Sequence, residues 1–235
     1  MPRDPRPNGL LLTPELVARA HRAVIDHGPP ADRERMRDAD YDALAEELLR
    51  RAEPGEDIWL FASGSLIWNP ACPSVEQRPA EVPGWHRSFC LRLVWYRGTP
   101  EWPGLMMWLD RGGLCRGVAY RIPRAEAWEA LGKVLRREIT VKPAANQPRW
   151  LPARVAGARR PAIGFVVNRQ IPAYVGRLPA EQAADLIATG CGHVGSCAEY
   201  LLNTVVKLQE HGIRDRNLWH LQALVAQRLA GMSLS

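Results

Sequence analysis

Glu138 is the residue of this 235-residue chain whose position most clearly points to chemistry. It follows Trp128, Leu131 and Leu135 on one stripe at helical spacing, so its carboxylate is expected to face the core side of a helix. Burial and the negative end of the helix macrodipole both raise a carboxyl pKa toward the range that a general base needs near neutral pH. Arg136 and Arg137 act in the opposite direction. Glu138 is therefore a candidate acid–base group, and a helix-end glutamate that reaches solvent or pairs with an arginine is the alternative.

A second feature is the segment from Ile58 to Pro70, IWLFASGSLIWNP. Its apolar start predicts a buried strand, and the strand ends in a turn that contains Gly64. Glycine lets the backbone turn tightly and come close to a ligand. Consecutive backbone N–H groups in such a turn form a concavity that suits a carboxylate. An ordinary exit from a strand into a loop is the structural alternative.

Other reaction chemistries have weaker support in the sequence. There is no GxSxG elbow, no P-loop or dinucleotide fingerprint, and no Cys and His cluster at zinc spacing. Cys197 lies near His193, but it falls inside a capping box on an apolar helix face, which favours a structural thiol. We therefore expect no cofactor and no metal site.

Composition and charge limit the classes of partner. The chain is 46% hydrophobic and 24% charged, as in globular proteins, and no apolar stretch is long enough to span a bilayer. The net charge is +6, but the basic residues are scattered and no nucleic-acid motif accompanies them. Five cysteines without a CxxC pair indicate reduced thiols and a cytoplasmic protein. We expect neither nucleic acid nor membrane as a partner, and the sequence leaves the oligomeric state open.

The periodicity predicts strands in the middle of the chain and helices at both ends. Strands are expected over residues 58–62, 85–96, 105–109, 114–122, 153–155 and 162–167, with Gly112-Gly113 as a hairpin turn. Helices are expected from Pro14 to a stop at Gly28, over residues 125–139 and from Ser196 to Gly212, with two more that begin at Asp40 and Asp215. The expected N-caps are Thr13, Asp40, Ser196 and Asp215.

This order predicts an α+β fold rather than an alternating parallel sheet. Residues 1–56 are expected to form an N-terminal helical arm that packs on the main domain, residues 57–235. The two parts together are expected to form a single globular unit.

Several ordered motifs make the chain similar to the ChaC-type γ-glutamylcyclotransferases. The motifs are FASGSLIWNP at Phe61 to Pro70, GWHRSFCLRL at Gly84 to Leu93, RGTPEWPG at Arg97 to Gly104, GGLCRGVAYRIP at Gly112 to Pro123, LRRE at Leu135 to Glu138, PRWLPARV at Pro148 to Val155 and GSCAEYLLNTV at Gly195 to Val205. The resemblance covers the chain from about Asp57 to near the C-terminus. It implies a small mixed β-barrel flanked by helices.

The resemblance also implies an activity and a site. Members of this family cleave glutathione to 5-oxoproline and cysteinylglycine without a cofactor. The family's catalytic glutamate corresponds to Glu138. Its substrate-binding loop corresponds to Ala62, Ser63, Gly64, Ser65, Leu66 and Ile67, whose backbone would hold the γ-glutamyl group.

Two positions depart from the family pattern. The family usually has Tyr where this chain has Ser63, and a second usual tyrosine corresponds to Asn146. The function that the resemblance implies is glutathione cleavage by a γ-glutamylcyclotransferase. Another γ-glutamyl amide as substrate, or a non-catalytic regulatory or binding relative, are the alternatives.

Overall fold

The computed structural model describes residues 9–232, and these form two compact units. The first unit contains residues 9–28, 92–106 and 177–232, and the second contains residues 29–91 and 107–176. The N-terminal arm expected over residues 1–56 stays a prediction.

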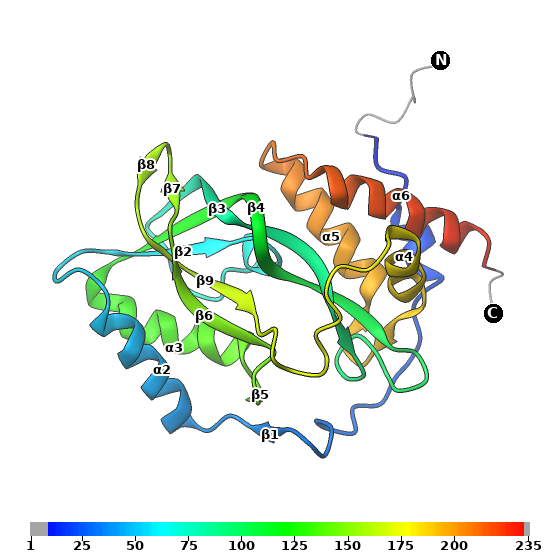
Figure 1. The fold of residues 1–235 in the computed structure, drawn as a ribbon, viewed down its shortest axis with the longest axis horizontal. Helices are drawn as coiled ribbons and strands as arrows, with labels where there is room; N and C mark the ends of the chain where they lie inside the picture. Colours follow the sequence, from blue (N-terminus) through cyan, green and yellow to red (C-terminus); the bar gives the residue numbers. More distant parts are fainter. Residues whose placement is uncertain (1–8, 233–235) are drawn as a thin grey trace. The chain divides into compact units, whose positions relative to one another are not determined.

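The second unit is built around a curled sheet of seven strands, in the order β6-β9-β2-β4-β3-β7-β8 (Figure 1). The strands are β2 (Ile58–Ala62), β3 (Glu76–Leu93), β4 (Gly104–Ile122), β6 (Asn146–Leu151), β7 (Arg154–Val155), β8 (Ala158–Arg159) and β9 (Ala162–Val167). Strand β9 pairs in parallel with β2 and with β4, while β2 and β4 pair antiparallel, so the sheet is mixed. The sheet encloses a core that includes Trp59, Phe61, Leu109, Leu151 and Val166.

Two helices of the second unit lie side by side along the sheet (Figure 1). They are α2 (Asp38–Arg50) and α3 (Ala127–Glu138), and the 3-10 helix η2 (Arg124–Glu126) leads into α3. The indole Nε1 of Trp150 in β6 donates a hydrogen bond of 3.1 Å to the Leu48 carbonyl of α2. The short strands β1 (Glu34–Arg35) and β5 (Val141–Lys142) pair with each other. The predicted α+β class is confirmed, and the expected small mixed barrel is a curled sheet.

The first unit is mainly helical. Its helices are α1 (Pro14–Ala18), α4 (Ala180–Thr189), α5 (Cys197–Glu210) and α6 (Arg216–Ala230), with a small β10 (Cys191–Gly192) and β11 (Gly195–Ser196) hairpin. Helices α4 and α5 both pack on α6. Three predicted N-caps are confirmed, since the side chains of Thr13, Ser196 and Asp215 each accept a backbone N–H of the helix that follows.

Several local predictions differ from the structure. The prediction of a hairpin turn at Gly112 and Gly113 is wrong, because both glycines lie inside the continuous strand β4 with positive φ angles of 110° and 71°. They let the strand coil and exchange partners instead of turning back. Helix α1 ends at Ala18, well before Gly28. Helix α2 begins at Asp38, so Asp40 lies in its first turn and is not the N-cap. Strand β6 and helix α4 were not expected.

Candidate active site

Helix α3 carries Glu138 as its last residue, at the end of a buried stripe. Leu131 and Leu135 are almost fully buried, and the side chain of Glu138 is only 10% exposed. The sequence also placed Trp128 on this stripe, but Trp128 is 50% exposed, so that assignment is wrong. Ala127 and Ala130 are buried instead, so small side chains form the buried face at the start of the helix.

Two hydrogen bonds fix the end of α3 and with it the position of Glu138. The Ile139 N–H donates to the Leu135 carbonyl at 2.8 Å, which closes the last turn. The Tyr41 hydroxyl of α2 donates to the Ile139 carbonyl at 2.9 Å. Ile139, the residue after Glu138, is therefore held through both its N–H and its carbonyl group, and the carboxylate is placed by the packing of α2 against α3.

The surroundings of Glu138 favour its neutral form. Burial raises the pKa of the Glu138 carboxyl to about 7, and the Arg137 guanidinium opposes this rise. Arg137 Nε lies 3.6 Å from Glu138 Oε1, which is an ion-pair distance but too long for a hydrogen bond. No hydrogen bond from the described residues reaches the carboxylate. A carboxyl with this pKa can accept and return a proton near neutral pH.

The loop after β2 presents free backbone donors. Strand β2 ends at Ala62, which pairs with Val118, and the 3-10 helix η1 (Ser65–Ile67) follows. Within the described part of the chain, the N–H groups of Gly64, Ser65 and Leu66 donate to no protein acceptor. The first N–H groups of any helix lack intrahelical acceptors, so this loop offers a place for an anion.

Close packing under the loop depends on Gly117 of β4. A Cβ atom added to Gly117 would lie 2.4 Å from the Ala62 carbonyl oxygen and 2.8 Å from the Phe61 ring. Such contacts are far inside van der Waals distance, so only glycine lets β4 lie against the end of β2. On the other side, the Tyr120 hydroxyl of β4 donates to the Ile67 carbonyl at 2.8 Å and holds η1.

Electrostatic interactions through Cys72 connect the end of α3, which carries Glu138, to this loop. Burial raises the pKa of the Cys72 thiol to about 11, while the nearby Arg137 and Lys133 cations of α3 lower it. Cys72 in turn is close enough to raise the pKa of Tyr120, after the larger effect of burial. Cys72 interacts with Arg137, which lies beside Glu138, and with Tyr120, which bonds to Ile67. The end of α3 and the η1 loop therefore belong to one region of the second unit.

Strand register places Asn146 on the same face of the sheet as Tyr120. Residues directly opposite each other on neighbouring strands point to the same face of a sheet. Three such pairs cross the sheet from β6 to β4: Trp150 with Ile163, Ile163 with Leu60, and Leu60 with Tyr120. Asn146 precedes Trp150 by four residues and therefore shares that face. It is 1% exposed, and its Nδ2 has no hydrogen-bond partner among the described residues. Such a buried, unpaired donor is rare in folded proteins.

Sequence reasoning missed Arg87 as part of this region. Arg87 in β3 is 4% exposed, and its Nε donates to the Ser63 carbonyl at 2.6 Å. Its position inside the motif GWHRSF was the available signal, but nothing in the local pattern shows that the side chain reaches the loop. The contact follows from the pairing of distant strands.

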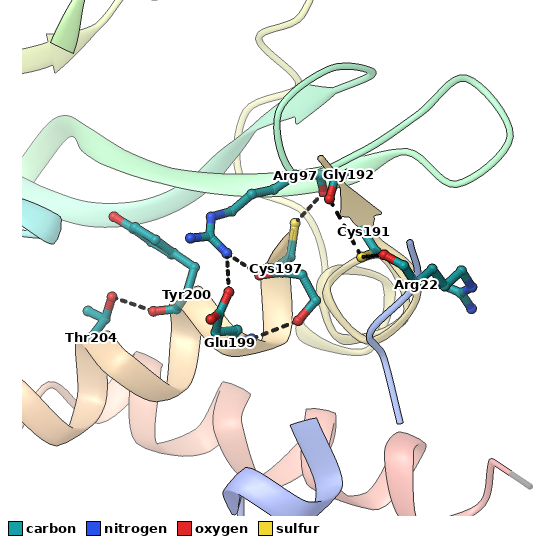
Figure 2. Close-up of polar contacts among 9 residues, drawn as sticks. Arg22, Arg97, Cys191, Gly192, Cys197, Glu199, Tyr200 and Thr204 are labelled. Atoms are coloured by element: carbon teal, nitrogen blue, oxygen red, sulfur yellow. Dashed lines mark hydrogen bonds and ion pairs between the residues drawn. The ribbon is translucent and has the colours of Figure 1, made fainter. Parts of the chain in front are cut away.

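The thiol considered as an alternative nucleophile is structural. Cys197 begins α5 in the first unit and is fully buried, with its Sγ 3.1 Å from the Arg97 carbonyl oxygen (Figure 2). Burial raises the pKa of this thiol to about 12, so almost no thiolate forms near neutral pH. Arg97 Nη1 also bonds to Glu199 Oε2 at 2.7 Å, which ties the RGTPE segment to α5 (Figure 2). All five cysteines are free thiols.

The fold has a mixed, curled sheet, and the candidate site has a buried glutamate of raised pKa and a glycine-containing turn whose backbone N–H groups are unpaired in the described chain. The sequence pattern described as "ChaC-like protein" matches residues 58–228, and the chain belongs to the ChaC-like family.

Two curated relatives are similar over most of their length. The chain is 36% identical to the glutathione-specific γ-glutamylcyclotransferase of Escherichia coli K12, over 80% of each chain. It is 30% identical to glutathione-specific γ-glutamylcyclotransferase 1 of Mus musculus, over 72% of this chain and 76% of the mouse protein.

A solved structure shares the fold. The crystal structure of a γ-glutamyl cyclotransferase specific to glutathione from yeast superposes with a TM-score of 0.65 at 21% identity, over 73% of this chain and 96% of the yeast chain.

No helix in residues 9–232 is both long and apolar enough to cross a membrane.

Proposed function

We propose that this protein is a γ-glutamylcyclotransferase that cleaves glutathione to 5-oxoproline and cysteinylglycine. The observation that carries the proposal is the buried Glu138 carboxyl, whose pKa of about 7 suits proton transfer in both directions. The relatives named for this reaction support the choice of glutathione. Five free thiols suit a reducing compartment, so we place the reaction in the cytoplasm.

The reaction is an intramolecular aminolysis. The α-amine nitrogen of the glutamyl group attacks the γ-carbonyl carbon, a new C–N bond closes the five-membered lactam, and the original γ-amide C–N bond breaks. Because both reacting groups belong to one molecule, much of the entropic barrier is absent once the chain is folded into the attacking shape. The enzyme must hold that shape and move protons from the attacking nitrogen to the departing nitrogen.

Glu138 is assigned the proton transfer. As a carboxylate it takes a proton from the α-ammonium group, and as a carboxylic acid it gives that proton to the departing amine nitrogen. After the new C–N bond has formed, the attacking nitrogen gives up a second proton in the same way, so the products are a lactam with one N–H and cysteinylglycine with a protonated amine. The net reaction consumes no water and leaves Glu138 in its starting state. A pKa of about 7 leaves a substantial fraction of the enzyme in the carboxylate form that begins the cycle.

The loop of Ala62 to Ile67 is assigned the γ-glutamyl group. Its three unpaired N–H groups would hold either the α-carboxylate or the oxyanion that develops on the γ-carbonyl. The two roles differ in kinetics, since carboxylate binding lowers KM and oxyanion binding raises kcat.

The test is direct. Purified protein is incubated with glutathione, and 5-oxoproline and cysteinylglycine are quantified by mass spectrometry. Stoichiometric formation of both products is expected, and Glu138→Gln should slow it by roughly 10²–10⁴-fold. Glutamate and cysteinylglycine in place of 5-oxoproline would show hydrolysis and refute the cyclotransferase assignment.

A second candidate is the same chemistry on another γ-glutamyl amide. The observation that favours it is the pair Ser63 and Asn146, which stand where tyrosines are usual, with Ser63 half-buried in the loop. Relative kcat/KM values over a panel of γ-glutamyl dipeptides and glutathione distinguish the two candidates. Ser63→Tyr should shift the ranking toward glutathione, because an aromatic wall helps to immobilise the bent glutamyl chain. A non-catalytic relative would bind panel members without turning any of them over.

A further inference from the structure

Arg87 connects the candidate anion loop to the sheet. Its guanidinium is buried in β3, where Nε donates to the Ser63 carbonyl at 2.6 Å and Nη2 donates to the Arg116 carbonyl of β4. A buried guanidinium bonded to backbone carbonyls is a strong, directional contact, because one partner is charged. Ser63 is thereby fixed to two strands that are distant from it in sequence.

Peptide geometry extends this contact to the next residue. The Ser63–Gly64 peptide is trans, since the cis bond of the described chain is Lys142–Pro143. In a trans peptide the C=O and N–H groups point in opposite directions within one plane. Fixing the Ser63 oxygen on Arg87 therefore turns the Gly64 N–H away from Arg87, and this N–H has no acceptor in the described chain.

The same contact strengthens the Gly64 donor. A charge-assisted hydrogen bond to a carbonyl polarises the whole peptide unit, and linked hydrogen bonds reinforce one another by roughly 10–30% each. Burial of the guanidinium increases the effect, because little water screens the charge. The Gly64 N–H is thus both oriented and polarised before any ligand arrives.

We propose that Arg87 is a positioning residue that aims and activates the Gly64 N–H as an anion donor of the active site. The inference rests on the proposed function, since the anion is the γ-glutamyl group of the substrate. Arg87 itself does not touch the substrate, and it acts through the Ser63–Gly64 peptide.

Isotope labelling of the single peptide bond between Ser63 and Gly64 tests this role without a measurement of activity. Ser63-Gly64 is the only Ser-Gly pair in the sequence, so cell-free protein made with carbonyl-¹³C serine and ¹⁵N glycine gives one cross-peak in an HNCO spectrum. Addition of 5-oxoproline should shift the Gly64 amide proton of the wild type downfield. In Arg87→Met the Ser63 carbonyl signal should move upfield, and the response to 5-oxoproline should be largely lost.

Kinetics give the second readout. Arg87→Met should lower kcat/KM for glutathione by about 10–100-fold, somewhat less than deletion of an oxyanion donor, because the Gly64 N–H remains present but loses its orientation. Arg87→Lys should recover part of the loss, and the acidic limb of the pH profile should not move, because Glu138 is untouched. Arg19→Met is the matched control, since Arg19 Nη1 also bonds to backbone carbonyls, those of Leu229, Ala230 and Met232 in the first unit.

The outcomes separate the two proposals. If the wild type forms no 5-oxoproline from any γ-glutamyl substrate, the proposed function fails. If the wild type is active and folded Arg87→Met keeps kcat, KM and the Gly64 response to 5-oxoproline, the positioning role is overturned while the function stands. If Arg87→Met does not fold, the comparison of Arg87→Lys with the wild type gives the same decision from the same cross-peak.

Discussion

The Tyr41 hydroxyl lies 2.9 Å from the carbonyl oxygen of Ile139, the residue that directly follows Glu138. Tyr41 is buried in α2 and Ile139 is buried at the end of α3, so this hydrogen bond connects the two helices next to the proposed acid–base group. Tyr41→Phe should lower the free energy of unfolding by about 1–3 kcal/mol, because it leaves a buried carbonyl without its donor. Urea denaturation measures the change.

The same variant should also lower kcat, since the last turn of α3 loses one of its two anchors. Trp150→Phe is the control, because it removes a hydrogen bond from α2 at Leu48 instead. The control should lose stability but keep kcat. Equal losses of kcat in the two variants would show that the Tyr41 bond has no special relation to Glu138.

Glu138→Gln should reduce turnover by roughly 10²–10⁴-fold, the usual contribution of general acid–base catalysis, while the fold is kept. Glutamine preserves size and polarity but cannot accept the proton of the α-ammonium group. Glu129→Gln makes the same chemical change on the same helix, at an exposed residue paired with Lys133, and should retain full activity. Near-normal turnover by Glu138→Gln would mean that another group acts as the base.

The wild-type rate should depend on pH through Glu138. Because the carboxylate begins the cycle, kcat/KM should rise with pH through a limb whose apparent pKa is about 7. Initial rates between pH 5 and pH 9, an experimental range of about four pH units around this value, measure the limb. A limb at the ordinary pKa of a glutamate would show that the carboxyl is not desolvated in solution.

Stability should depend on the same group with a defined sign. The folded pKa of Glu138 is raised from 4.5 to about 7, so the folded state binds this proton more tightly than the unfolded state. The resulting stabilisation is fully present below pH 4.5 and is lost as the pH rises through about 7. At about 1.4 kcal/mol per pKa unit, the loss is on the order of 3 kcal/mol.

Glu138→Gln removes this titration. The difference in unfolding free energy between the wild type and the variant should therefore change by that amount between acidic and alkaline buffer, with the variant favoured at alkaline pH. Paired denaturation curves in buffers on both sides of the transition measure it. A difference that is independent of pH would contradict the burial of Glu138.

Asn146→Leu should leave the unfolding free energy unchanged or raise it by about 1 kcal/mol. The Asn146 side chain is buried and its Nδ2 has no partner, so an apolar side chain of similar shape removes a desolvation cost without breaking a bond. Asn168→Leu is the control, because Asn168 Nδ2 donates to the Ala144 carbonyl at 3.0 Å and should lose stability. Destabilisation of Asn146→Leu to the same extent would show that the amide is paired in solution.

Features that depend on neighbouring residues were predictable from the sequence. The caps at Thr13, Ser196 and Asp215 and the strand Ile58–Ala62 follow from local hydrogen bonding and apolar patterning, which a short window contains. The placement of Glu138 on the last turn of α3 follows from the same helical periodicity. The sequence also contained enough ordered motifs to indicate the family.

Pairing between distant segments decided the rest. Gly112 and Gly113 look like a hairpin turn in isolation, but β4 stays continuous because β3, β2 and β9 all pair with it. Strand β6 has a proline and little apolar pattern, and it forms only because it adds to β9 at the edge of the sheet. Helix α4 buries mainly alanines, so its sequence gives a weak apolar stripe.

The chemistry of the site shows the same division. Sequence spacing identified Glu138, but its pKa depends on how completely α2, α3 and the sheet exclude water, and no local pattern contains that quantity. The contact between Arg87 and Ser63 joins residues 24 positions apart through the pairing of strands. The sequence by itself determines residue types and local patterns such as helical periodicity and caps. Desolvation of a side chain and contacts between strands arise only when the chain has folded.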